Sequence, residues 1–211
     1  MRPVIAAFLL LLLAGCATTQ PPAPRPPPPD PRTLMSALEQ RIAILIADQR
    51  SRIDPEAKPL MIDPELVDIA RQRSSDMATK HYFAHAAPNG DTSASILMAE
   101  DTRFQGLLGE NIAAQHYRAE LGIDVDQFAR SFVDIWLKSP KHKENLAYAE
   151  YNRTGIGAAV DGDTVYVTQL FATDLGLGPH LDAPADPVTP IRDNHAIVPK
   201  PKPEPGLRGP R

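Results

Sequence analysis

The sequence predicts an α+β domain in which helices come first along the chain and an antiparallel hairpin closes it. Two observations carry this prediction. Apolar residues recur at helical spacing in three segments before Pro140, and two strand-type segments flank a glycine-containing turn after it. Helices and strands that are segregated along a chain in this way are typical of α+β packing.

Two helices are predicted to start at Asp-Pro dipeptides, because aspartate caps a helix and proline suits the first helical position. The first runs from Asp30-Pro31 to about Arg52, and the second starts at Asp63-Pro64. Their buried faces are expected to consist of Leu34, Leu38, Ile42 and Leu45 in the first helix and of Leu66, Ile69, Ala70 and Met77 in the second.

Two further helices are predicted in the middle of the chain. A turn at residues 88–90 precedes Asp91, which is expected to cap a short helix that ends at Met98. In a third strong helix, apolar residues recur at i, i+4, i+7 and i+8, and Pro140 is expected to end it. These apolar residues, all expected in the core, are Phe128, Phe132, Ile135 and Trp136.

The period of the pattern then changes to that of strands. Residues 155–160 and 164–171 flank Asp161-Gly162-Asp163, which predicts a β-hairpin with a tight glycine turn.

The first sixteen residues predict export and anchoring. A positive start is followed by an apolar run over residues 4–13, which is too short for a lasting transmembrane helix. The run ends in Leu13-Ala14-Gly15-Cys16, which resembles the bacterial lipobox. This resemblance implies a cell-envelope lipoprotein whose Cys16 is lipidated, becomes the mature N-terminus and is held stably by two or three acyl chains. An ordinary signal peptide that ends near a cysteine is the alternative. Ala17 favours the outer membrane if the host is Gram-negative.

Proline-rich segments flank the domain. Eight of the chain's 23 prolines lie between residues 20 and 31, so residues 17–32, after the signal peptide of residues 1–16, are expected to form an extended linker. Nine more lie in residues 179–211, which are predicted to be a disordered tail. The folded domain is therefore assigned to residues 33–178. The net charge of −4 gives no sign of nucleic-acid binding, and the single cysteine excludes an internal disulfide.

Four phrases occur in order within this domain. They are DMATKHYFAH at residues 76–85 with PNG at 88–90, GENI at 109–112, WLKSPKHKEN at 136–145, and GIG at 155–157 leading to YVTQLF at 166–171. Together they resemble the CAP superfamily of cysteine-rich secretory, antigen 5 and pathogenesis-related proteins, and most of all its bacterial SCP-like branch. The resemblance implies a three-layer α-β-α sandwich with a central antiparallel sheet and a cleft on one side.

The resemblance also implies a set of cleft residues. In eukaryotic members two histidines and two acidic residues face each other across the cleft. Matched by motif, the histidines are His85 and His142, and one acid is Glu110. The place of the second acid falls on Ser139, so this chain departs from the pattern of two carboxylates. Glu144 is an alternative that the motif does not require.

Two functions follow from this set of residues. His85 and His142 are candidate ligands of Zn²⁺ or another divalent cation, although no cofactor is certain, and Glu110 would then serve a metal-dependent hydrolase of peptide or wall polymer. Alternatively, these residues form a hydrogen-bonded network in a non-enzymatic binding cleft, beside which Asn111 satisfies backbone groups. We favour the binding module, with the membrane, through lipidated Cys16, and a wall component, lipid or envelope protein as partners.

Overall fold

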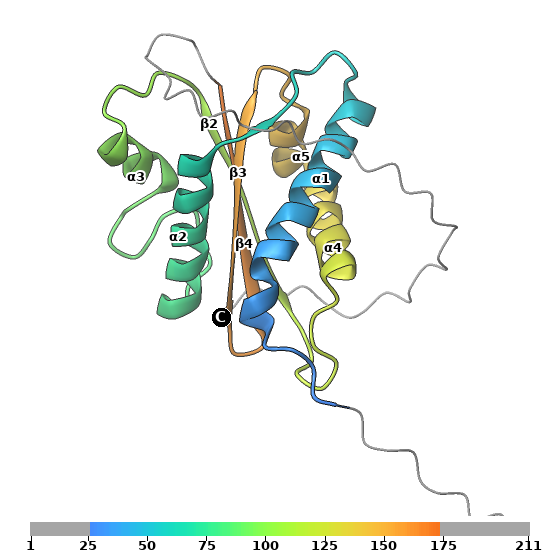
Figure 1. The fold of residues 1–211 in the computed structure, drawn as a ribbon. Helices are drawn as coiled ribbons and strands as arrows, with labels where there is room; N and C mark the ends of the chain where they lie inside the picture. The colour runs from blue at the N-terminus through green and yellow to red at the C-terminus, as the bar shows by residue number, and fades with distance from the viewer. Residues whose placement is uncertain (1–25, 174–211) are drawn as a thin grey trace, which may run out of the picture.

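In the computed structural model, which describes residues 26–173, a sheet lies between two layers of helices (Figure 1). Helices α2 and α3 cover one face of the sheet, and α1, α4 and α5 cover the other. The elements in chain order are η1 (Pro31–Leu34), α1 (Met35–Ile53), β1 (Met61–Ile62), α2 (Pro64–Lys80), α3 (Ser93–Glu100), β2 (Leu108–His116), α4 (Val125–Lys138), α5 (Pro140–Ala147), β3 (Arg153–Asp161) and β4 (Thr164–Ala172). The predicted α+β class and its three layers are confirmed.

The sheet has the strand order β1-β3-β4-β2. It is antiparallel, as expected, except that the two-residue β1 pairs in parallel with β3. Strand β1 belongs to the segment that carries the chain from α1, in one layer, to α2, in the other (Figure 1). Strand β2, which holds the GENI phrase, was not predicted as a strand and lies at the opposite edge of the sheet.

The predicted hairpin is confirmed as β3 and β4. Asp161 and Thr164 are the last residues to pair, so Gly162 and Asp163 form a two-residue loop. Gly162 has a φ of +55°, a value that glycine adopts without steric cost, as the first position of this kind of turn requires.

The GIG phrase of β3 needs its two glycines because α2 packs directly against the strand backbone. A Cβ atom on Gly155 would lie 2.2 Å from the carbonyl carbon of Leu66, and one on Gly157 would lie 2.0 Å from the amide nitrogen of Arg71. The hydroxyl of Ser74 reinforces the contact by donating to the Gly157 carbonyl oxygen over 2.8 Å. Helix α2 can therefore approach the sheet only where the strand has no side chain.

Helices α1 and α4 form the main core with the other face of the sheet. Of the residues predicted to be buried, most are inaccessible to solvent, and Trp136 is 0% exposed. Three of them, Leu34, Leu45 and Ile135, are instead partly buried at the margin of this core. Pro140 ends α4 as predicted and also opens α5, because a proline at the first helical position lacks only an amide that would have no partner.

The short helix starts one residue later than predicted. Thr92, not Asp91, is its N-cap: its side chain accepts from the amide of Ser95, and the Ser95 hydroxyl accepts in turn from the Thr92 amide. The carboxylate of Asp91 instead accepts a hydrogen bond from the Asn89 side chain within the preceding turn. The helix also ends later, at Glu100 rather than Met98. A reciprocal capping box thus decides the start where two cap-forming residues are adjacent.

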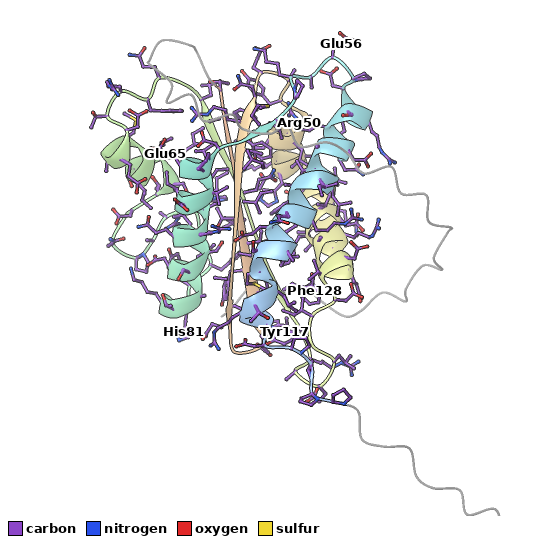
Figure 2. The ribbon with its side chains drawn as sticks, viewed as in Figure 1. Arg50, Glu56, Glu65, His81, Tyr117 and Phe128 are labelled. Atoms are coloured by element: carbon purple, nitrogen blue, oxygen red, sulfur yellow. The ribbon has the colours of Figure 1, made fainter. Side chains whose placement is uncertain are left out.

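Arg50, near the end of α1, links this helix by hydrogen bonds to the segments around α5 (Figure 2). The side chain is buried, and its two terminal nitrogens donate to four backbone carbonyls, those of Leu146 and Tyr148 and those of Lys58 and Tyr151. Helix α5 is thereby held in place beside the sheet by hydrogen bonds rather than by apolar packing alone.

Among the helices of residues 26–173, none combines the length and the apolar character that crossing a bilayer requires. The predicted signal peptide, its Cys16, part of the linker, the end of the domain at residues 174–178 and the tail lie outside the described residues.

Candidate functional site

The site forms where the loop after α2 meets strand β2. Helix α2 ends at Lys80, and its C-cap His81 has a left-handed conformation, with a φ of 54°, that turns the chain back (Figure 2). The loop then brings the Nδ1 atom of His85 to 2.6 Å from the Oε1 atom of Glu110. The Glu110 side chain is 12% exposed, whereas that of His85 is 59% exposed. The histidine is thus fixed at one ring nitrogen while much of its ring faces solvent.

Ser93, the first residue of α3, completes this contact. Its hydroxyl donates to the second carboxylate oxygen of Glu110, and the residue is 2% exposed. Both oxygens of Glu110 are therefore engaged by side chains of the protein. The sequence did not reveal this role, because a serine at the start of a helix has the same pattern as an ordinary cap.

Strand β2 and helix α5 are joined by asparagine side chains. The Asn111 amide donates to the backbone carbonyl of His142 over 3.1 Å. The Asn145 amide donates to the Glu110 backbone carbonyl over 3.1 Å and to the side-chain oxygen of Asn111 over 2.8 Å. Asn111 satisfies a backbone group, as predicted. The WLKSPKHKEN and GENI phrases are thus joined by one hydrogen-bond network.

Trp136 contributes to the same edge from the core. Its indole nitrogen donates to the backbone carbonyl of Ile112 over 3.2 Å. Because β2 is an edge strand, this carbonyl would otherwise lack a strand partner. The tryptophan is a core residue, as predicted, and it also closes part of the sheet edge.

His142 and Ser139 lie on the α5 side of this network. The Nδ1 atom of His142 is buried and has no hydrogen-bond partner among the residues the structure describes. Ser139 is the junction between α4 and α5, and its side chain makes no capping hydrogen bond. The structure therefore pairs His85 directly with Glu110, whereas it places His142 within electrostatic reach of His85 without a direct bond.

The surroundings of the two histidines push their pKa values in opposite directions. The hydrogen bond to Glu110, together with the charge of that carboxylate, raises the pKa of His85. Burial, followed by the positive charge of His85, lowers the pKa of His142. The site therefore favours a protonated His85 beside a neutral His142.

The donor atoms in their present arrangement do not fit a metal centre. Within residues 26–173, no group of three or more histidine, cysteine, aspartate or glutamate side chains is placed to hold a metal ion. Glu110 is occupied by His85 and Ser93. The zinc site at His85 and His142 stays a prediction, and the structure supplies no third ligand for it.

Two adjoining hollows lie along α3 and the start of β2. The smaller, with a volume of about 160 Å³, is lined by His85, Thr92, Ser93, Ala94, Leu108, Gly109 and Glu110. The larger, of about 320 Å³, is lined mainly by apolar side chains: Ala94, Leu97, Met98, Phe104, Gln105, Gly106 and Leu108. Ala94 and Leu108 belong to both, so the hollow that contains His85 and Glu110 adjoins the one lined by Leu97, Met98 and Phe104.

Known proteins share this arrangement of elements. The chain is 27% identical over 128 residues to YkwD of Bacillus subtilis, which corresponds to 61% of this chain and 45% of that protein. It is 31% identical to an extracellular protein containing an SCP domain from Bacillus anthracis, with a TM-score of 0.54, over 72% of this chain and 45% of that one. The chain thus spans less than half the length of either relative.

A third likeness concerns the fold alone. An outer surface protein of Borrelia burgdorferi superimposes with a TM-score of 0.53 at 22% identity, over 65% of this chain and 92% of that protein. The family model described as the cysteine-rich secretory protein family matches residues 55–171, from the loop after α1 to the end of the sheet. This match covers more than half of the chain, and the protein therefore belongs to the CAP family of cysteine-rich secretory proteins.

Proposed function

We propose that this protein is a non-enzymatic binding module of the cell envelope, tethered by a lipid on Cys16, that takes its ligand in the cleft at His85 and Glu110. The observation that carries the proposal is the state of His85. Its ring is held at one nitrogen by Glu110, yet 59% of the side chain is exposed. A fixed polar group that faces solvent is suited to recognition, because little conformational entropy is lost on binding.

The shape of the cleft indicates the chemistry of the ligand. A polar group of the ligand would accept a hydrogen bond from His85, and an apolar group next to it would enter the hollow lined by Leu97, Met98 and Phe104. Mostly apolar walls with a few convergent polar groups are typical of binding pockets. Wall components, lipids and envelope proteins all offer such pairs of groups.

The placement in the envelope rests on the N-terminal sequence and on the relatives. Leu13-Ala14-Gly15-Cys16 resembles a lipobox, and residues 17–32 would space the domain from the membrane. The matched proteins include an extracellular one and an outer surface one. Growth of cells on an alkyne-bearing fatty acid tests the anchor: the wild-type protein should be labelled, and Cys16→Ser should not.

Ligand binding is tested by co-sedimentation of the tagged domain with purified wall sacculi and, separately, with vesicles of host lipids. His85→Ala and Met98→Ser should both reduce the bound fraction, since they remove the polar and part of the apolar contact. His116→Ala is the matched control, because it deletes another exposed histidine that is paired with a carboxylate, Asp163, outside both hollows. Equal binding by all four proteins would refute the cleft as the binding site.

One observation supports the second candidate, a metal-dependent hydrolase of peptide or wall polymer. Histidines whose pKa values are pushed apart are a common feature of acid–base sites. This function would require Glu110 to exchange its partners His85 and Ser93 for substrate or metal. Release of labelled fragments from sacculi in the presence of Zn²⁺, abolished in Glu110→Gln, would favour it over the binding module.

A further inference from the structure

Arg73 is a cation buried directly beneath the loop that carries His85. The residue lies on α2 and is 1% exposed, a rare position for a charged side chain unless it is paired. Its Nη1 atom donates to the hydroxyl of Tyr82 over 2.9 Å. Its Nη2 atom donates to two backbone carbonyls, that of Ala84 over 3.2 Å and that of His85 over 3.0 Å.

The charge of Arg73 is balanced through Tyr82 and Asp76. The Tyr82 hydroxyl donates to the Asp76 carboxylate over 2.6 Å, and the same carboxylate lies 4.0 Å from Nη1 of Arg73. Burial and the hydrogen bond to Asp76 raise the pKa of Tyr82 to about 12, so the phenol keeps its proton and remains a donor. The guanidinium therefore has a neutral hydroxyl partner at Nη1, separate from the two loop carbonyls that its Nη2 atom contacts.

The loop itself offers no regular structure that could hold His85. Ala84 and His85 lie between the end of α2 and the isolated bridge of Ala86 with Thr92. Their carbonyls accept from Arg73 instead of from a helix or strand. The backbone position of His85 decides whether its ring can reach Glu110, so the two contacts of Nη2 act directly on the site.

We propose that Arg73 is the positioning residue of the cleft: its guanidinium holds the backbone at Ala84 and His85 so that the His85 ring meets Glu110. Lysine cannot replace it, because an ammonium group lacks the planar fork that reaches Tyr82 and both carbonyls together. This inference rests on the proposed binding function only in its consequence for ligand affinity; the geometry of His85 can be tested without a ligand.

The test uses nitrogen NMR of the His85 ring, detected through its carbon-bound protons at a fixed pH. Glu110→Gln provides the spectrum of a ring that has lost its carboxylate partner. Arg73→Lys is expected to shift both ring nitrogens towards the Glu110→Gln positions. Tyr82→Phe, which removes one contact of Arg73 but leaves both loop carbonyls bonded, should retain the wild-type shifts. A folded Arg73→Lys protein with wild-type His85 shifts would overturn the proposal.

If Arg73→Lys does not fold, the wild-type protein supplies the measurement. Nuclear Overhauser contacts between the Arg73 guanidinium protons and the α-protons of residues 84 and 85 are expected, and their absence would equally overturn the proposal. Co-sedimentation with sacculi or vesicles is measured separately. Shifted His85 resonances with no binding by any variant would contradict the proposed function alone.

Discussion

Comparing Trp136→Ala with His85→Ala tests whether Trp136 is a core residue and His85 a cleft residue. The side chain is 0% exposed, lies in the core between α1, α4 and the sheet, and donates to the Ile112 carbonyl of the edge strand over 3.2 Å. The substitution therefore opens a cavity and also removes the partner of a buried carbonyl two residues from Glu110.

The cost follows from these two losses. Truncation of a buried tryptophan to alanine destabilises a domain by about 3–5 kcal/mol. A buried carbonyl left without a donor adds about 1–3 kcal/mol. Since domains are stable by only about 5–15 kcal/mol, the variant should lose a large share of its free energy of unfolding. His85→Ala should cost much less, because the side chain is 59% exposed and lies outside the core.

Urea unfolding of Trp136→Ala, His85→Ala and Trp136→Phe measures the free energy of unfolding that each substitution removes. Trp136→Phe removes the hydrogen bond and part of the volume, so its loss should fall between those of the other two. The slope of free energy against urea should stay constant if each transition is two-state. A His85→Ala domain less stable than Trp136→Ala would show that the assignment of core and cleft is wrong.

Three further predictions concern packing, pH and metal. Gly157→Ala should destabilise the domain by about 3 kcal/mol or more in urea, because its Cβ would lie 2.0 Å from the α2 backbone; unchanged stability would refute direct helix–strand contact. The raised pKa of His85 adds stability that is complete below about pH 6.5, the unfolded pKa, and is lost as the pH rises through the folded value. The lowered pKa of His142 acts oppositely: its contribution is present above about pH 6.5 and is lost as the pH falls through the folded pKa. The destabilisation caused by His85→Ala should thus shrink with rising pH and that caused by His142→Ala should grow, and parallel curves would exclude both. Calorimetric titration with Zn²⁺ should show no stoichiometric binding, as the lack of a third ligand in residues 26–173 implies; binding that disappears in His85→Ala/His142→Ala would favour the hydrolase.

Local chemistry was sufficient to predict much of the fold. Asp63 followed by proline marks the start of α2, and its carboxylate does accept from the amide of Glu65. The spacing of Phe128, Phe132 and Trp136 predicts α4, and Gly162 predicts the hairpin turn. Each of these signals lies within a few residues of the feature that it determines, so no distant contact is needed to read it.

The family motifs predicted the cleft residues but not how they bond. His85, Glu110 and His142 were chosen by resemblance alone. Only the tertiary structure shows that His85 pairs with Glu110, whereas His142 makes no direct bond to either. Strand β2 was also not predicted, because the polar Glu110 and Asn111 interrupt its apolar pattern. It forms a strand by pairing with β4, and hydrogen bonds to α5 hold its outer edge.

Residues close together in the sequence were enough to predict α1, α2 and α4, the hairpin turn, most of the core and the family resemblance. The roles of Ser93 and Arg73 depend on contacts that form only in the folded domain, because in the sequence the two residues look like a helix cap and an ordinary helical cation. The two kinds of feature differ in how far apart in the sequence the interacting residues lie. Caps and periodicity act between neighbours in the chain, whereas a buried hydrogen-bond network assembles groups from separate elements, and its partners exist only once the sheet and its two helical layers have packed.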